Sequence, residues 1–326
     1  MRIETEMTRL LGCRLPIIAG PMFLVSTPEL VSAVSGAGGV GAMPSLNWRT
    51  TELFDAAVQS VAAGPFAINL IVNASNTRMQ ADLDVCVRRR VPLVITSLGN
   101  PKKVIDAMHA VGSKVFCDVT TLAYAEKVLG LGADGVIAVS QGAGGHAGPV
   151  SPLVLIPYLR RNLPKVPIIA AGGIATGQQM AAMLLLGASG VQIGTRFIAS
   201  TEAEVNQAYK DAILRAEPED IVMTTRISGT PAAVIKTPFI EQQGLDLSFI
   251  EKKLLAHPRT KKIAKMVRMM LGSRLLEQAS TKPTWKTVWS AGQGVGLIDS
   301  ILPCSEIIEQ IMREYESSAM IAIQKE

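Results

Sequence analysis

The stretch Leu131-Gly-Ala-Asp-Gly-Val-Ile137 returns with two changes as Leu186-Gly-Ala-Ser-Gly-Val-Gln192. In each copy a helical stretch ends at a Gly, which readily adopts the left-handed conformation found after helices. A short apolar run, typical of a strand, then follows. Repetition of this kind is expected from a chain built of alternating strands and helices.

Along the chain on both sides of the repeat, eight short apolar runs alternate with segments whose residues favour helices. Thr27-Pro28-Glu29 is such a signal, because Thr can cap a helix, Pro suits its first position and an acidic residue suits its first turn. Nearly continuous apolar runs indicate parallel strands that are buried on both faces. The predicted strands are Pro16–Ala19, Gly39–Met43, Phe66–Leu70, Leu93–Thr96, Lys114–Asp118, Gly135–Val139, Pro167–Ala170 and Gly190–Ile193.

Eight strands that alternate with helices predict an α/β protein, a closed (β/α)8 barrel of the TIM type. The competing fold, an open doubly wound sheet, usually has roughly five to seven strands. A barrel needs roughly 250 residues, and the chain has 326. We predict the barrel over residues 1–216, a helical lid over 217–283 that includes the Lys-, Leu- and Met-rich Leu245–Leu276, and a C-terminal segment over 284–326 that returns to the barrel.

Composition narrows the class of protein. Hydrophobic residues make up 48% and charged residues 18%, which suffices for a packed core, whereas aromatic residues make up only 4% and argue against a surface that stacks on nucleic acid. The chain shows no signal peptide and no long apolar run, so we expect a cytoplasmic protein without a membrane partner. The four Cys residues have no CxxC spacing, and we expect neither disulfides nor a metal site.

The basic residues are concentrated in one segment. Glu251–Lys286 contains ten Lys and Arg residues and two acidic residues, a local net charge of +8, whereas the whole chain carries +5. One interpretation is that these residues form a solvent-exposed face of a helix and have no binding role. The alternative is a docking surface for an acidic partner or a phosphate-bearing substrate.

Candidate binding residues follow three of the predicted strands, at the end of a barrel where active sites lie. The first strand ends in Gly20-Pro21-Met22, where small residues allow a flat ring to approach the backbone. The third ends in Asn69, a polar amide that must find a partner, and the fifth ends in Asp118. A purely structural interpretation is also open for each of them, as part of a tight turn or as a residue that caps a helix.

The loop after the sixth strand, Gln141-Gly-Ala-Gly-Gly-His-Ala-Gly148, is the strongest candidate. Apart from Gln141 and His146 it has almost no side-chain bulk, so it can wrap closely around a ligand while it presents one titratable group. Imidazole can take a proton from a carbon acid or stabilise developing negative charge. We therefore predict His146 as the catalytic residue, with Gln141, Gly144 and Gly145 against the ligand.

Two Gly-containing loops predict a phosphate site. Gly172-Gly173 follows the seventh strand and Gly194-Thr195 follows the eighth, where barrels commonly bind phosphate through backbone amides. The Gly-rich stretch Trp289–Gly296 is expected to return to this mouth, which adds Gln293 to the candidates. A phosphorylated ligand follows from this arrangement. FMN and a phosphosugar both fit it.

The sequence resembles the nitronate monooxygenase family, long named 2-nitropropane dioxygenases. The resemblance runs in order from about residue 10 to residue 300 and implies an FMN-binding barrel. By match to the family's motifs, FMN would be touched by Met22, Asn69, Gly144, Gly172, Gly173, Gly194 and Thr195, and His146 falls on the active-site His. The motifs are Pro16–Met22, Phe66–Leu70, Ala143–Gly148, Ile169–Gly173, Gly194–Phe197 and Trp289–Gln293.

The resemblance implies an activity and leaves rivals open. In the family, a substrate nitronate reduces the flavin and O2 completes turnover to a carbonyl compound and nitrite. The same group contains NAD(P)H:quinone reductases and FMN-dependent enoyl-acyl-carrier-protein reductases. Many members carry Glu or Cys before the Gly-His loop, and this chain carries neither. A non-catalytic flavin protein and a phosphosugar-binding barrel are the other readings. We expect a small-molecule substrate and O2 as partners, with a homodimer as the candidate assembly.

Overall fold

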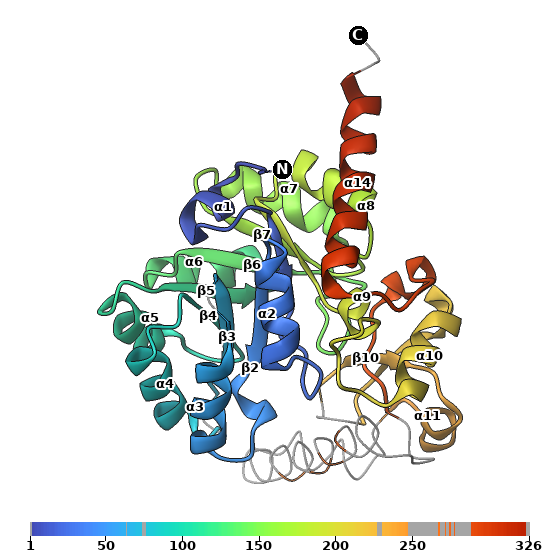
Figure 1. Cartoon of the computed structure of the whole chain (residues 1–326), viewed down its shortest axis with the longest axis horizontal. Helices are drawn as coiled ribbons and strands as arrows, with labels where there is room; N and C mark the ends of the chain where they lie inside the picture. Colours follow the sequence, from blue (N-terminus) through green and yellow to red (C-terminus); the bar gives the residue numbers. More distant parts are fainter. Residues whose placement is uncertain are drawn as a thin grey trace.

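A computed structural model describes residues 2–323 except residues 63, 74–75, 227–229 and most of 247–287, where only Val267, Leu271, Arg274 and Glu277 are described. Eight parallel strands close into a barrel in the order in which they occur in the chain, and β1 pairs with β8 through Ile17 and Val191 (Figure 1). The strands are β1 (Ile17–Ala19), β2 (Val40–Pro44), β3 (Phe66–Ile71), β4 (Leu93–Ser97), β5 (Lys114–Val119), β6 (Gly135–Val139), β7 (Ile168–Ala171) and β8 (Gly190–Ile193). The predicted barrel is confirmed, with each strand within about one residue of its expected bounds.

Helices between the strands surround the barrel. Thr27, Thr50, Thr121 and Thr176 begin four of them, because each hydroxyl accepts a hydrogen bond from a backbone N–H three residues further on. These helices are α2 (Pro28–Gly36), α3 (Thr51–Ser60), α4 (Met79–Arg88), α5 (Lys102–His109), α6 (Leu122–Gly130), α7 (Pro152–Asn162) and α8 (Gly177–Leu185).

The barrel interior is filled by side chains from alternate positions of the strands. Ile18, Ile95, Phe116 and Ile137 are fully buried in one cluster, together with Met7 of the short helix α1 (Glu6–Leu11) at the opposite, N-terminal end of the strands. In a strand every second side chain points to the same face. The next inward positions, two residues further along each strand, therefore lie at the mouth where the strands end.

The chain beyond β8 differs from the predicted helical lid. After α9 (Thr195–Ile198) and α10 (Gln207–Arg215), β9 (Ile221–Thr224) and β10 (Ala232–Ile235) form an antiparallel pair, followed by α11 (Pro238–Gln243). Within the predicted lid, residues 221–224 and 232–235 are therefore strand and not helix, because these two apolar runs pair with each other. Val267, Leu271, Arg274 and Glu277 are helical, and the rest of the basic segment lies outside the described residues.

The C-terminal part packs on the outside of the barrel. A 3-10 turn at Gln293–Leu297 leads to α14 (Cys304–Ile323), which packs against α8 and α2 and projects beyond the rest of the molecule (Figure 1). At Gly177 this helix approaches so closely that an added Cβ would lie 1.9 Å from the carbonyl oxygen of Ile311. The Gly177 N–H also donates to the carboxylate of Glu314 at 2.7 Å. No helix among the described residues is long and apolar enough to cross a membrane.

Candidate functional site

A chain of polar side chains crosses the mouth of the barrel on three neighbouring strands. Asn69 at the end of β3 donates from Nδ2 to the Ser97 hydroxyl of β4 at 2.8 Å and to the Ile95 carbonyl at 3.2 Å. The Ser97 hydroxyl donates in turn to Oδ2 of Asp118 on β5 at 2.5 Å. Since Ser97 has one proton to give, the direction of the chain is fixed from Asn69 towards Asp118.

Two side-chain oxygens at the mouth, one on Asp118 and one on Gln192, have no hydrogen-bond partner in the part of the chain that the structure describes. Oδ1 of Asp118 and Oε1 of Gln192, on β8, are buried and accept no hydrogen bond there. Burial raises the pKa of Asp118 to about 6, and the Ser97 hydrogen bond opposes that rise. Buried polar atoms are normally satisfied, so two unsatisfied acceptors at a barrel mouth indicate a ligand that supplies donors.

The loop that carries His146 is held by the strand pair that follows the barrel. The Gly145 N–H donates to the Ala233 carbonyl at 3.1 Å, and the Ala233 N–H donates back to Gly145 at 2.7 Å, so β10 extends onto this loop. His146 itself is exposed. Its imidazole is therefore presented on a fixed backbone at the same end of the barrel as the polar layer.

The C-terminal segment reaches the same loops. The Gly292 N–H donates to the Thr195 hydroxyl at 3.0 Å, and the Gln293 N–H donates to the Gly142 carbonyl at 2.9 Å. A Cβ at Gly144 would lie 2.9 Å from the backbone nitrogen of Gly292, so only Gly allows this approach. The loops after β6 and β8 are thus joined by a segment that lies about one hundred residues after β8 in the chain.

An aromatic pair supports this segment from α10. The Tyr209 and Trp289 rings stack with centroids 5.6 Å apart and planes 8° apart. The Tyr209 hydroxyl donates to the Ser290 carbonyl at 2.5 Å. On the other side, the Ile235 N–H of β10 donates to the Trp289 carbonyl at 2.9 Å. Trp289 and Ser290 are consequently held from two elements.

The predicted phosphate site has unused backbone donors. Among the described residues, no protein acceptor takes the amides of Gly172, Gly173, Gly194 or Thr195. A Cβ on Gly173 or Gly194 would meet no atom closer than 3.8 Å, so space lies in front of both. Gly172 and Gly173 have φ values of +132° and +69°, which turn the backbone after β7 as other residues rarely can.

Two leucines beside the mouth have a backbone conformation that is uncommon outside Gly. Leu24, in the loop after β1, has φ +61°, and Leu98, directly after Ser97, has φ +59°. Leu24 is stabilised by a hydrogen bond from its N–H to Oδ1 of Asn47 at 2.8 Å. Left-handed non-Gly residues cost free energy and gather at functional sites. Their position agrees with a site at this end of the barrel.

The predicted residues all lie at the carboxyl ends of strands or in the segment that reaches them. The structure joins Asn69 to Asp118 through Ser97, and Thr195 to Gly292 beside Gln293. Pro21 and Met22 are half-buried in the loop after β1, and Gln141 is exposed. Sequence reasoning missed Ser97 and Gln192. A period-two count from the buried strand centres would have placed both at the mouth.

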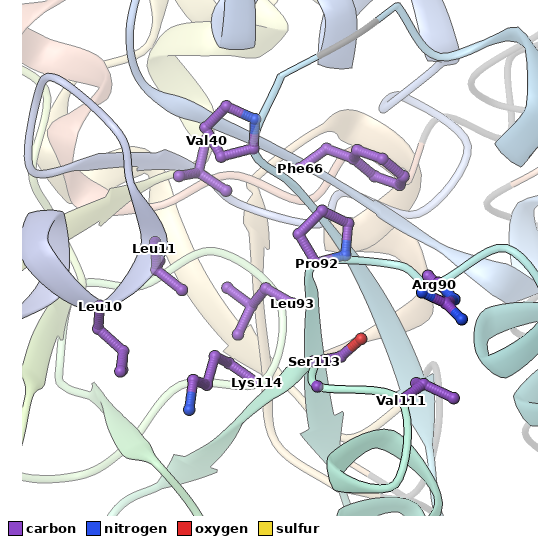
Figure 2. A pocket seen from close by; sticks show the side chains of 12 residues that line it. Leu10, Leu11, Val40, Phe66, Arg90, Pro92, Leu93, Val111, Ser113 and Lys114 are labelled. Carbon is purple, nitrogen blue, oxygen red and sulfur yellow. The ribbon is translucent and has the colours of Figure 1, made fainter.

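A pocket of about 280 Å³ lies at the opposite end of the barrel. Figure 2 shows its lining, in which Leu10 and Leu11 come from α1 and Phe66, Leu93 and Lys114 begin three strands. Those residues mark the amino ends of the strands. In barrels of this type that end serves stability and the other end serves chemistry, so we place the functional site at the mouth and not in this pocket.

Comparison with known proteins identifies the family. The family model described as nitronate monooxygenase matches residues 4–314. FabK from Thermotoga maritima is 33% identical, with a TM-score of 0.86 over 99% of this chain and 100% of that chain. A (3aS,4S,5R,7aS)-5-hydroxy-7a-methyl-1-oxo-octahydro-1H-indene-4-carboxyl-CoA dehydrogenase of Mycobacterium tuberculosis is 29% identical over 96% of both chains. A probable nitronate monooxygenase of Staphylococcus saprophyticus is 28% identical over 96% of this chain and 98% of its own. The chain therefore belongs to the nitronate monooxygenase family, and it is an oxidoreductase.

Proposed function

We propose that this protein binds FMN and oxidises alkyl nitronates with O2 to carbonyl compounds and nitrite. The observation that carries the proposal is the position of His146, an exposed imidazole on a loop that β10 fixes at the barrel mouth. The loop lies at the end of the barrel that also carries the unsatisfied oxygens of Asp118 and Gln192. A base beside an acceptor-lined, unsatisfied site suits proton chemistry on a carbon acid.

The residues at the mouth fit FMN at both of its ends. The unused amides after β7 and β8, at Gly172, Gly173, Gly194 and Thr195, are donors suited to a phosphate. The unsatisfied oxygens of Asp118 and Gln192 suit the N–H of a flavin pyrimidine ring. A phosphosugar would use the first set of groups but offers no planar ring with such an edge, so the polar layer favours the flavin.

The residues at the mouth would have separate roles in the proposed reaction. FMN, when bound, accepts electrons from the substrate. His146 would take the proton from a neutral nitroalkane or hold the negative charge of its nitronate. The hydrogen bonds between Gly145 and Ala233 hold the backbone of the loop that carries this imidazole. The segment around Gly292 bridges the loops after β6 and β8 at the rim of the site.

Anaerobic stopped-flow absorbance tests the proposal. The purified protein, reconstituted with FMN, is mixed with an alkyl nitronate and separately with NADH and NADPH, and loss of the oxidised flavin band is followed. We expect the nitronate to bleach the band. His146→Ala should slow bleaching by the neutral nitroalkane, whose carbon must first lose a proton, by roughly 10²–10⁴-fold, the usual contribution of a general acid–base group, and should slow bleaching by the preformed nitronate less. His109→Ala is the matched control, because that His lies on the outer helix α5 and binds Asp134. If NADH or NADPH bleaches the flavin band and the nitronate does not, nitronate oxidation is refuted.

Reduction of an enoyl thioester by NAD(P)H is the second candidate. The observation that favours it is the 33% identity to FabK over nearly the whole chain, together with the carboxyl-CoA dehydrogenase among the sequence relatives. Rapid bleaching by NADH or NADPH, followed by reoxidation on addition of an enoyl-CoA, would establish it. The same instrument therefore separates the two candidates.

A further inference from the structure

The pocket at the amino end of the barrel is separate from the site proposed for the flavin. Its volume is about 280 Å³, close to the lower bound of the roughly 300–1,000 Å³ that ligand pockets have. The described residues that line it are mostly apolar, and they include two cations, Arg90 and Lys114, and no carboxylate. Lys114 pairs at 3.2 Å with Asp134, which lies outside the lining. Arg90 forms no ion pair with any described residue, so the lining carries one unpaired positive charge.

Arg90 has a backbone conformation that Gly would adopt more readily. Its φ is +48°, in the left-handed region, just after the end of α4. The N–H of the next residue, Val91, donates to the Cys86 carbonyl at 3.0 Å, the usual hydrogen bond where a helix ends at a left-handed residue. Four other helices of the barrel end with the same hydrogen bond and have Gly at this position, namely Gly38, Gly112, Gly132 and Gly187.

Attraction of a cation to the carboxyl end of the helix is the structural explanation for Arg90. Two other cations already lie at this helix end, because Arg88 and Arg89 pair with Asp55 at 2.8 and 2.6 Å. The Arg90 side chain, in contrast, forms neither a hydrogen bond nor an ion pair with the described residues. Uncommon backbone conformations gather at functional sites, so this one indicates that the side chain has a use besides folding.

The pocket has a polar side and an apolar side. Figure 2 shows Arg90 and Ser113 on one side and Leu10 and Leu11 of α1 on the other, with Leu93 between them. The Ser113 hydroxyl forms no hydrogen bond with the described residues, so this side offers two kinds of donor, a hydroxyl and a guanidinium. Such donors suit the two oxygens of a carboxylate, and leucine side chains suit an alkyl chain.

We propose that this pocket binds a small amphipathic monocarboxylate, with its carboxylate on Arg90 and Ser113 and its alkyl chain against the leucines of α1. The small volume limits the ligand to a short chain. Chemistry in barrels takes place at the opposite end of the strands, so this site binds its ligand and does not transform it. The inference is independent of the flavin site proposed above.

Isothermal titration calorimetry with octanoate tests the inference. Acetate has the charge without the chain, and 1-octanol has the chain without the charge. We expect octanoate to bind about tenfold or more tightly than either. Added FMN should leave the octanoate affinity unchanged, because the mouth lies at the other end of the barrel. Equal binding of octanoate and 1-octanol, an absence of octanoate binding, or competition between octanoate and FMN overturns the inference.

Arg90→Gly separates a ligand-binding role from a structural one. Gly relieves the left-handed backbone, so we expect the Tm of the unliganded protein to rise by about 1–2 °C while the octanoate affinity falls by about tenfold or more. Arg90→Lys keeps the positive charge and should retain part of the affinity. Arg161→Gln is the matched control, because Arg161 is also exposed, lies in the last turn of α7 and forms no ion pair with the described residues. It should leave octanoate binding unchanged.

Two results with these variants would contradict the inference. A lower Tm in Arg90→Gly would show that the Arg90 side chain is structural. Octanoate binding that survives in Arg90→Gly, or that falls equally in Arg161→Gln, would show that Arg90 does not hold the carboxylate. Neither result changes the proposed oxidation of nitronates, which depends on residues at the mouth.

Discussion

Replacement of Asp118 by Asn should stabilise the flavin-free protein at neutral and alkaline pH. The carboxyl group is buried at the mouth, Oδ2 accepts one hydrogen bond from Ser97, and Oδ1 accepts none from the described residues. Its pKa is raised from 3.8 to about 6, chiefly because burial disfavours the charged form. Asn has nearly the same shape, can still accept from Ser97 and never ionises.

The magnitude follows from linkage between protonation and folding. A rise of about two pKa units corresponds to about 3 kcal/mol of lost stability once the group is ionised in both states. The sign is definite. Below pH ~4 the group is neutral in the folded and unfolded chains and imposes no penalty. As pH rises from ~4 to ~6 the unfolded chain releases the proton first, so stability falls, and above ~6 the penalty is constant.

Thermal unfolding at two pH values measures this effect. We expect Asp118→Asn to raise Tm by roughly 5 °C at pH ~8 and by about half of that at pH ~5. Asp106→Asn is the control, because Asp106 lies on the outer helix α5 in an exposed pair with Lys102. An equal gain at both pH values, or a variant less stable than the unmodified protein at pH ~8, would refute the burial argument.

Two further predictions concern the contacts of this site and of α14. Ser97→Ala removes the hydrogen bond that lowers the Asp118 pKa, so the fall of stability with pH should extend above pH ~6; an unchanged midpoint in the pH series would contradict this. Gly177→Ala places a Cβ 1.9 Å from the Ile311 carbonyl and should destabilise the protein by roughly 1–3 kcal/mol or more in urea unfolding. Gly130→Ala, where a Cβ meets nothing within 4 Å, should be neutral or stabilising, and equal effects of the two Gly substitutions would exclude the steric explanation.

The barrel could be predicted from the sequence because its strands are marked locally. Each is an apolar run bounded by turn residues, and burial on both faces forbids polar interruptions. The pair β9–β10 was not predicted, although Ile221–Thr224 and Ala232–Ile235 are apolar runs of the same kind. What makes them strands is pairing with each other and contact with Gly145 and Ser290, residues distant in sequence. Local patterns do not contain that information.

The site was predictable to the level of strand ends and no further. Asn69 and Asp118 stand out because each is a polar residue at the end of an apolar run. Ser97 and Gln192 are equally well placed, but Ser97 follows another hydroxyl residue and Gln192 lies inside a run, so neither stands out. The unsatisfied state of the Gln192 oxygen depends on which neighbours reach it in three dimensions. Only the assembled barrel defines those neighbours.

The hairpin that holds the His146 loop imposes an order on synthesis. All eight barrel strands have been made when the ribosome passes Ile193, yet the loop at Gly145 must wait for Ala233, and the rim must wait for Ser290 and Gly292. At about 5–20 residues per second, the chain from the last strand to the rim takes roughly 5–20 s to make. During that interval all eight strands are present, but the elements that complete the mouth are still missing. A chain truncated shortly after α10 should therefore lose the site, because it lacks both Ala233 and Gly292.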